Sequence, residues 1–260
     1  MDRLHPVVAG LSTTSRASAI QGCETCVVRR WSLCRPLSHD ELSELARVRT
    51  GTRVLGPGSS VIEGGEEADA LFVIENGWAF SHAITADGRR QILEFHLPGD
   101  MLGIEAVGRV EAPHGVETIT EVALCVLPRP RLETLMRREA TLAFSFACVV
   151  SRDRAMLAER LASLGRRAAS ARVAHLLLEL HARLMQRGMA EHDNCALPLK
   201  QAHIADAVGL TVEHTNRALA ELRREGLATL RDGRLTLHDR RALIELSGWD
   251  DAYLRTARLP

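Results

Sequence analysis

Residues 199–226 constrain the fold more than any other part of this 260-residue chain. They read LKQAHIADAVGLTVEHTNRALAELRREG, two helical patterns separated by a glycine. Gly209 suits the unusual backbone geometry of a tight turn, and Thr211 can cap the second helix. The first pattern places three apolar residues on one face: Ile204, Ala205 and Val208. The segment therefore predicts a helix-turn-helix.

The next residues, LATLRDGRLTLH, predict two short strands around Asp232-Gly233, which is a strong hairpin signal. A helix-turn-helix followed by a hairpin is a winged-helix arrangement, a module that reads DNA. Glu213, Asn216 and Arg217 would lie on the outer side of the second helix near its start, where a major groove would admit them. Thr211 and Lys200 are the other residues predicted to bind DNA.

These side chains suit the edges of bases. Arginine can pair bidentately with guanine, glutamate can accept from cytosine, and asparagine can contact adenine or a phosphate. The alternative is an ordinary solvated helix face. Four basic side chains nearby could contact phosphate without reading sequence: Lys200, Arg223, Arg231 and Arg234.

The charge distribution favours the same end of the chain for an anionic partner. Net charge is zero, but residues 1–150 hold 15 Lys and Arg against 19 Asp and Glu, whereas residues 151–260 hold 18 against 14. The two parts therefore carry −4 and +4.

Three cysteines lie within twelve residues near the N-terminus, Cys23, Cys26 and Cys34, with the spacing C-x2-C-x7-C. Thiolates bind soft metals and iron-sulfur clusters, and a C-x2-C pair lets two sulfurs converge on one site. The candidate fourth ligand is Cys125, about ninety residues further on.

The sequence predicts a cytoplasmic protein with reduced thiols. It shows no convincing signal peptide and no apolar run near the roughly 20 residues that a membrane span needs. Six cysteines in such a chain favour metal binding or redox sensing over structural disulfides.

The middle of the chain predicts β structure. Ser38 and Glu41 indicate the start of a short helix over 38–49. Short β-prone runs follow between about 52 and 128, beginning at positions 61, 71, 78, 92 and 116 and separated by glycine-containing turns. Regular spacing of this kind indicates a small antiparallel barrel or roll.

A helical pattern replaces the strands from about Pro130 to Gly165. Its apolar seam, with spacings of four and three, is typical of a coiled coil and predicts dimerisation, although a helix packed only on its own barrel is the alternative. The seam comprises Val150, Leu157, Leu161 and Leu164, with Arg154 in register. A second helix over 168–187 and a polar connector, AEHDNCALP, complete the pattern.

The predicted fold class is α+β, with four parts. Residues 1–50 form an N-terminal cysteine-containing segment with its short helix, and residues 51–129 form the β-barrel sensor domain. Residues 130–165 form the dimerisation helix, and residues 166–260 form the winged helix-turn-helix DNA-binding domain.

This order of elements, together with the motif IADAVGLTVEHTNRALAEL, resembles the Crp/Fnr family of bacterial transcription factors from about residue 20 to 247. The resemblance implies a cyclic-nucleotide-binding-like barrel, a long dimerisation helix and a winged helix-turn-helix. The cysteines look like those of the Fnr branch of oxygen sensors, which hold an oxygen-labile 4Fe-4S cluster.

By this resemblance the cluster ligands are Cys23, Cys26, Cys34 and Cys125. The segments PGDMLGIEAVG and ETITEVALCVLP are similar to the Fnr pattern, whereas the x7 gap is longer than in the best-known enteric members. The resemblance also implies that Glu213 and Arg217 read the common core of the half-site. Val212 stands where Crp has arginine, which favours an Fnr-like half-site.

The implied function is an oxygen-responsive transcription regulator, not an enzyme, that binds an inverted-repeat operator in double-stranded DNA as a homodimer. Losing the cluster would shift it towards monomer. RNA polymerase is the implied partner, with the barrel turn Thr85 to Gly88 as one contact.

Ligands other than an iron-sulfur cluster remain open. The same thiols could bind zinc, form a redox disulfide or simply be buried, and haem is a further family option. Cyclic nucleotide is disfavoured because no arginine lies between Val110 and Val126. A cupin-like enzyme would need a compact His and carboxylate set, but His82 and His96 stand isolated. Cys148 and Cys195 are interpreted as a core residue and a loop residue.

Overall fold

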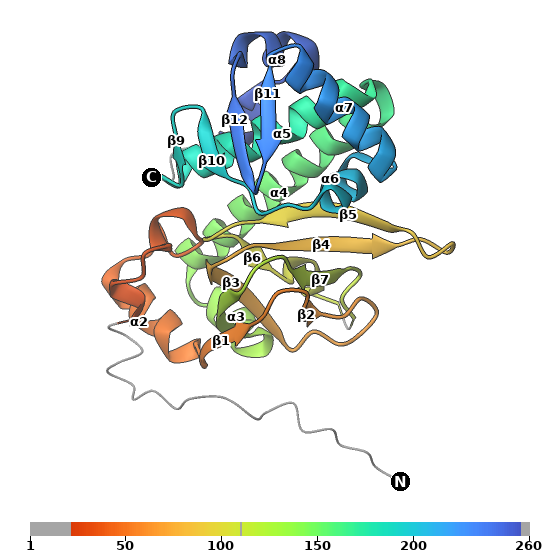
Figure 1. Ribbon diagram of the computed structural model, residues 1–260. Coiled ribbons are helices and arrows are strands. Elements are labelled where there is room, and N and C mark those ends of the chain that lie inside the picture. Colours follow the sequence, from red (N-terminus) through yellow and green to blue (C-terminus); the bar gives the residue numbers. More distant parts are fainter. Residues whose placement is uncertain (1–21, 110, 256–260) are drawn as a thin grey trace. The chain divides into compact units, whose positions relative to one another are not determined.

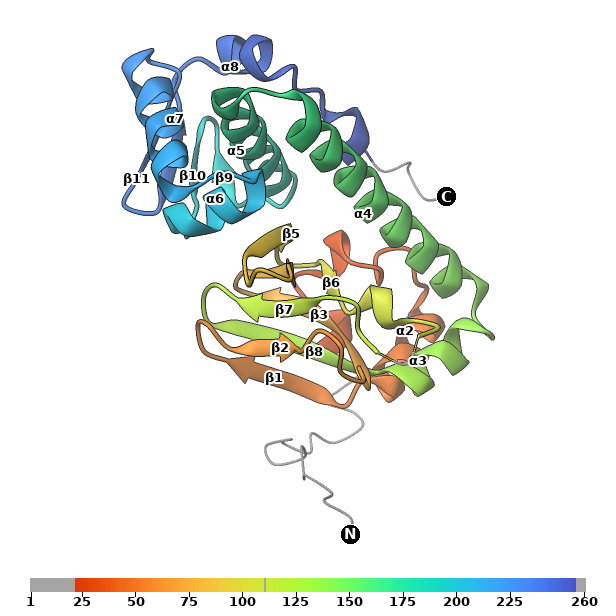
Figure 2. The ribbon, with the colours of Figure 1, turned by 90° about the vertical axis from the view of Figure 1, so that its right-hand side faces the viewer.

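The computed structural model describes residues 22–109 and 111–255, which divide into two compact units (Figures 1 and 2). The first unit contains the described residues up to Ser81 together with Phe95–Val149. The second contains His82–Glu94 and the described residues from Val150 onward. Within the described residues, no helix combines the length and hydropathy needed to cross a bilayer.

Two four-stranded sheets form the β domain, in the orders β1-β8-β3-β6 and β2-β7-β4-β5. Strand β8 pairs antiparallel with both β1 and β3. The strands are β1 (Gly51–Leu55), β2 (Ser60–Ile62), β3 (Ala70–Asn76), β4 (Ala79–Ile84), β5 (Arg90–His96), β6 (Met101–Leu102), β7 (Gly115–Thr118) and β8 (Val122–Pro128). The predicted antiparallel barrel or roll is confirmed.

Two details of the strands differ from the prediction. The single run expected from position 116 is broken into β7 and β8, because Ile119 N donates to Trp78 O (2.8 Å) and Trp78 N donates to Thr120 Oγ1 (3.0 Å). These bonds turn the chain between the two strands. Strands β1 and β6 were not predicted, since one is mostly solvent-facing and the other is only two residues long.

The helix predicted over 38–49 is α2 (His39–Val48), and it begins as expected. Glu41 N donates to Ser38 Oγ (3.3 Å), and Ser38 N donates to Glu41 Oε2 (2.8 Å). This reciprocal capping box satisfies two backbone donors at the helix start. Leu42 and Leu45 point into the core, each 2% exposed.

The N-terminal segment shares one hydrophobic core with the barrel and the helices that follow it. Trp31 approaches the barrel so closely that a Cβ on Gly99 would lie 2.9 Å from the Trp31 Cβ, and Gly99 has a φ of 94°. Both facts require glycine at that turn. The shared core comprises Val28, Leu33, Leu37, Leu42, Leu45, Leu71, Val73, Met101, Leu127, Leu132, Leu135 and Leu142.

A second apolar cluster packs between the strands of the β domain. Its buried members include Ile74, Ala79, Val122 and Leu124, each fully buried, and Phe72. This interior is therefore filled by aliphatic and aromatic side chains.

The helix predicted over 130–165 is two helices, α3 (Arg129–Met136) and α4 (Ala140–Arg166). Leu132 and Leu135 of α3 and Leu142 of α4 are all buried in the same core. The chain turns between the two helices, where Arg138 N donates to Leu135 O (2.9 Å). The helix therefore ends at Met136 and a new one begins at Ala140, so the prediction of a single helix was wrong.

The second unit has the winged helix-turn-helix order that was predicted. Its centre is α5 (Ala169–Gln186), most of whose residues are buried. Around it lie α6 (Gln201–Val208), α7 (Val212–Arg224), α8 (Arg240–Ser247) and a sheet of order β11-β12-β10-β9. The wing strands are β11 (Ala228–Arg231) and β12 (Arg234–Leu237). Asp232 and Gly233 join them with φ values of 50° and 71°, the positive values of a type I′ turn, so the predicted hairpin is present.

The polar connector is in fact two short strands, β9 (Ala190–Glu191) and β10 (Asn194–Ala196), which extend the wing sheet. Cys195 pairs with Leu235 of β12 and is only 3% exposed. The interpretation of Cys195 as a loop residue was therefore wrong. The residues around Cys195 are polar, so the sequence pattern did not indicate a strand. Cys195 is the one buried residue of β10.

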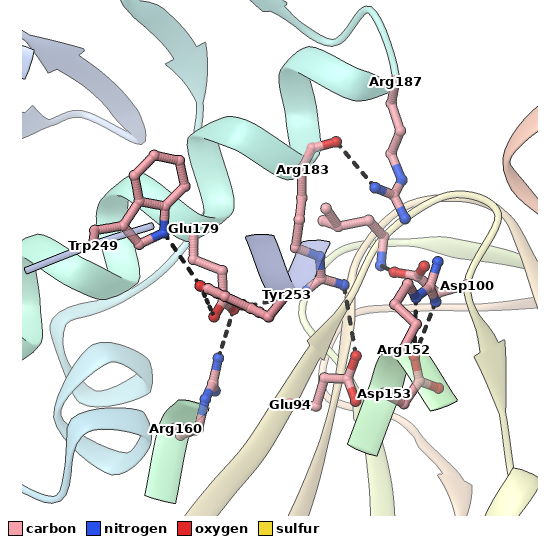
Figure 3. A network of polar contacts seen from close by, with 11 residues as sticks. Glu94, Asp100, Arg152, Asp153, Arg160, Glu179, Arg183, Arg187, Trp249 and Tyr253 are labelled. Atoms are coloured by element: carbon pink, nitrogen blue, oxygen red, sulfur yellow. Dashed lines mark hydrogen bonds and ion pairs between the residues drawn. The ribbon is translucent and has the colours of Figure 1, made fainter. Parts of the chain in front are cut away.

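The second unit also buries a carboxylate, Glu179 of α5, which is 2% exposed (Figure 3). Arg160 Nη2 donates to one of its oxygens (2.9 Å) and Tyr253 Oη to the other (3.0 Å), while Trp249 Nε1 donates to Tyr253 Oη (3.2 Å). A buried charge needs such partners to be tolerated. The turn η3 (Asp251–Leu254) is thereby anchored to α5.

Candidate functional site

The four cysteines proposed as ligands line one pocket in the first unit. Cys23, Cys26 and Cys34 come from the loop that precedes α2, and Cys125 comes from β8, where it lies between Thr52 of β1 and Val73 of β3. All four are partly buried and free of disulfides. The fold therefore brings together residues that are about ninety positions apart in sequence.

The backbone of the loop explains how a seven-residue gap fits between Cys26 and Cys34. Cys26 N donates to Cys23 O (3.4 Å), and Arg29 N donates to Cys26 O (3.1 Å). The gap is then taken up by the single 3-10 turn η1 (Arg29–Trp31). Cys34 N donates to Ser32 Oγ (3.2 Å), which fixes the backbone at the third cysteine. The long spacing is thus a compact turn, not an open loop.

Apolar side chains form most of the remaining wall of the pocket. They are Val28, Leu42, Leu45, Val73 and Leu127. Burial raises the pKa of the Cys34 thiol to about 12 and also raises the pKa of Cys23 and Cys125. Buried thiolates are unfavourable without a compensating positive charge, and a metal group supplies that charge. Four thiols in an apolar pocket fit an iron-sulfur cluster.

Two arginines, Arg29 and Arg49, line this pocket, and the sequence did not predict either. Arg49 Nη2 donates to Thr52 Oγ1 (2.6 Å) and to Glu75 Oε1 (3.2 Å), and Thr52 Oγ1 donates to Glu75 Oε2 (3.0 Å). Thr52 is the β1 residue paired with Cys125, so this guanidinium lies beside the fourth cysteine. A Cβ on Gly22 would lie 3.6 Å from Arg49 Nη1, so the guanidinium also borders the cysteine loop.

No sequence pattern marks these neighbours. Arg49 follows a helix as many surface arginines do, and Thr52 and Glu75 lie on two different strands. Their proximity to Cys125 depends on the register of β1 and β3 on β8. A register shift of one residue would have turned them to the other face.

The spacing of the thiols differs from that of a site for one ion. Among the described residues, no group of three or more His, Cys, Asp or Glu side chains is close enough together to hold a single metal ion. A tetrahedral zinc site would need all four sulfurs within about 2.3 Å of one point. The four cysteines line one pocket, but they do not form such a group.

The remaining two cysteines lie elsewhere. Cys148 is half-buried on α4, and Cys195 is buried in β10. Burial raises the pKa of the Cys195 thiol to about 11. Neither lines the four-cysteine pocket.

The second candidate site is the outer face of α7 in the second unit. Gly209 ends α6 with φ 65° and ψ 41°, the left-handed conformation predicted for the turn. Thr211 caps α7 by accepting from His214 N (3.2 Å). The Thr211 hydroxyl also lies 2.9 Å from His214 Nδ1. Both of these contacts are with the first turn of α7.

The three predicted base-reading residues are exposed on α7. Glu213 and Arg217 have side chains that are 82% and 64% exposed and form a loose ion pair at 3.8 Å, and Asn216 is exposed beside them. Thr215, Ala218 and Leu222 face inward. The helix therefore has one buried face and one polar face with free hydrogen-bonding capacity.

The residues predicted to contact phosphate are also exposed. Lys200 lies at the start of α6, where its backbone N donates to His203 Nδ1 (3.2 Å). The three arginines are Arg223, Arg231 and Arg234. Their roles in DNA binding stay predictions.

The apolar seam of α4 is also exposed within one chain. Val150 is 40%, Leu157 42% and Leu161 72% exposed, and Leu164 is half-buried. Large exposed aliphatic side chains at helical spacing are typical of an interaction surface. Dimerisation along this seam stays a prediction.

Two family models match the chain and together span both units. Residues 52–139 match the cyclic nucleotide-binding domain, and residues 171–246 match the Crp-like helix-turn-helix domain.

Curated relatives match over most of the chain. The fumarate and nitrate reduction regulatory protein of Escherichia coli (strain K12) is 25% identical over 226 residues, covering 87% of this chain and 90% of that protein. The protein of the same name from Salmonella typhimurium is also 25% identical over the same shares.

Solved structures agree in fold. FixK2 from Bradyrhizobium japonicum is 28% identical with a TM-score of 0.69, covering 76% of this chain and 97% of that one. A Crp-family transcriptional regulator from Thermus thermophilus is 27% identical with a TM-score of 0.61 over the same shares. With its β domain and its helix-turn-helix both matched, the chain belongs to the Crp/Fnr family of DNA-binding transcription regulators.

Proposed function

We propose that this regulator responds to oxygen through a 4Fe-4S cluster held by Cys23, Cys26, Cys34 and Cys125. The observation that carries the proposal is the shared pocket of the four thiols, which joins a loop to a strand across the first unit. The similarity to fumarate and nitrate reduction regulatory proteins supports it. A bound cluster would supply a redox-active, oxygen-labile group at this position.

A hydrogen bond connects the cysteine-containing loop at the pocket to α4. Ser145 Oγ of α4 donates to Leu33 O (2.7 Å), and both residues are buried. Leu33 lies directly before Cys34 in the loop. Ligation at Cys34 and Cys125 would hold the loop on β8, and this hydrogen bond ties the loop to the helix that carries the predicted dimer seam. The homodimer would be favoured when the loop is held.

The output is recognition of an inverted-repeat operator by two copies of α7. A dimer places two recognition helices about one DNA turn apart, roughly 34 Å. Glu213, Asn216 and Arg217 would contact bases, with Lys200 contributing phosphate affinity. Recruitment of RNA polymerase, through the turn Thr85 to Gly88, completes the proposal for a cytoplasmic activator.

Two other ligands compete with the cluster. A single zinc ion could use the same four thiols, so metal content decides between them. A cyclic nucleotide fits poorly because apolar side chains fill the β domain and residues 111–125 contain no arginine for its phosphate.

Purification without oxygen tests the proposal. We expect a brown protein with about four irons and four sulfides per chain that bleaches in air and then loses operator affinity. The same protein, bleached and reconstituted with iron and sulfide, should regain it. A colourless preparation containing one zinc per chain, with unchanged operator binding in air, would contradict the cluster.

A further inference from the structure

Arg49 and Glu75 form an ion pair at the rim of the four-cysteine pocket, and both side chains line it. Their N to O distance is 3.2 Å, and their side chains are only 14% and 25% exposed. Charges this far from bulk water act on their neighbours more strongly than surface charges do. Neither residue is a candidate ligand.

The two members of the pair have opposite effects on the cysteines. Both side chains line the pocket with the four cysteines. A positive charge stabilises negative sulfur nearby, and a carboxylate destabilises it. Arg29 also lines the pocket, but Arg49 is the guanidinium that is hydrogen-bonded to Thr52 of β1, the residue paired with Cys125.

The position of Arg49 is set by its partners. Thr52 Oγ1 and Glu75 Oε1 accept from the same nitrogen, Nη2, and these residues come from β1 and β3, the two strands that flank Cys125. The carboxylate fixes the guanidinium but also partly cancels its charge. The electrostatic field at the sulfurs therefore depends on both charges, and removing either the arginine or the carboxylate changes it.

We infer that Arg49 is a positioning residue that stabilises negative charge at the four-cysteine site, and that Glu75 holds it in place while weakening its field. The inference rests on the proposed function, because the negative charge in question is that of a cluster with four thiolate ligands. Hydrogen bonds and charges beside the sulfurs are known determinants of cluster potential and stability.

The test uses full-length protein prepared without oxygen in five forms: wild type, Arg49→Gln, Arg49→Lys, Glu75→Gln and Arg47→Gln. Arg47 is the matched control, because it lies on α2 two residues away, is half-exposed and pairs with Glu44 outside the pocket. Iron and sulfide content, the midpoint potential and the half-time of absorbance loss in air are measured for each.

We expect Arg49→Gln to move the potential in the negative direction and to shorten the half-time in air several-fold, because removing a positive charge disfavours the electron-rich state. Arg49→Lys keeps the charge and should stay close to wild type. Glu75→Gln should move both quantities in the opposite direction, since its amide oxygen can still accept from Arg49. Arg47→Gln should match wild type.

A purely structural role would make Arg49→Gln and Glu75→Gln shift in the same direction, and that result would overturn the inference. An unchanged potential in Arg49→Gln, or Arg49→Lys behaving like Arg49→Gln, would also overturn it. If Arg49→Gln holds no cluster, the midpoint potential of Glu75→Gln tests the inference instead. A potential more positive than that of wild type supports the inference, and any other result rejects it. Wild-type protein without iron and sulfide would instead defeat the proposed function itself.

Discussion

The two sites of this protein are built in opposite ways. The residues proposed to read DNA lie within five positions of one helix and are exposed, so α7 alone sets their relative positions. The four cysteines come from a loop and a distant strand and are partly buried, so only the packed first unit sets theirs. A local site tolerates changes in the rest of the fold, whereas a non-local site depends on it.

The strongest test of this contrast is Cys125→Ser. It removes the only proposed ligand outside the loop, so we expect bound iron to fall from about four per chain to near zero and oxygen-dependent operator binding to disappear. Iron and sulfide analysis under anaerobic conditions measures the effect. Cys148→Ser is the control, because Cys148 lies outside the pocket and should leave iron content unchanged.

The next largest effect should come from Leu161→Glu on the predicted seam. Burying a leucine is worth roughly 1.5–3 kcal/mol, and each dimer would lose two, so we expect dimerisation to weaken by about 100-fold or more. Sedimentation equilibrium of anaerobic protein measures it. Leu246→Glu alters an exposed leucine on α8 instead. Equal weakening by both variants would argue against the α4 seam.

Arg217→Ala tests the local site. One bidentate arginine contact discriminates between bases by about 1–3 kcal/mol, and each dimer would lose two. Specific operator affinity should therefore fall by roughly 30-fold or more while non-specific affinity changes little. Binding to matched and scrambled operators measures the ratio. Arg224→Ala removes an equally exposed charge at the far end of α7 and should preserve sequence preference. A preserved preference in Arg217→Ala would contradict the assignment of α7.

A pH dependence should arise in the second unit from Cys195, whose thiol pKa is raised by burial to about 11 from an ordinary value near 9. A raised thiol pKa stabilises the fold at low pH, and that stability is lost as pH rises from about 9 through 11. The loss is at most about 2–3 kcal/mol. Urea unfolding at pH 8 and pH 11 should show a smaller decrease for Cys195→Ala than for wild type. Identical decreases would rule out this thiol as the cause.

The smallest predicted effect is loss of the α7 cap. Thr211→Ala should destabilise the second unit by about 1 kcal/mol, because it leaves the backbone N of His214 without its partner. Thr211→Ser keeps the hydroxyl and should restore most of the stability. Urea unfolding followed by circular dichroism compares them. A cost for Thr211→Ser as large as for Thr211→Ala would indicate that the methyl group, not the cap, matters.

The sequence predicted most clearly what depends on nearest neighbours. Gly209, Thr211 and the Asp232-Gly233 turn have the expected backbone geometry because each conformation is determined within a few residues. The prediction failed where burial was decided by distant contacts. The strand that contains Cys195 follows from its pairing with β12, which lies about forty residues further along the chain.

The sequence by itself determined that this chain has a winged helix-turn-helix with Glu213, Asn216 and Arg217 in helical register, and that four cysteines are available. Only the tertiary structure decided that those cysteines share a pocket and that Arg49 and Glu75 lie at its rim. The physical reason is the separation in sequence over which each interaction acts. Helix periodicity and turn geometry act over a few residues, whereas strand register and core packing act between segments that the sequence order keeps apart.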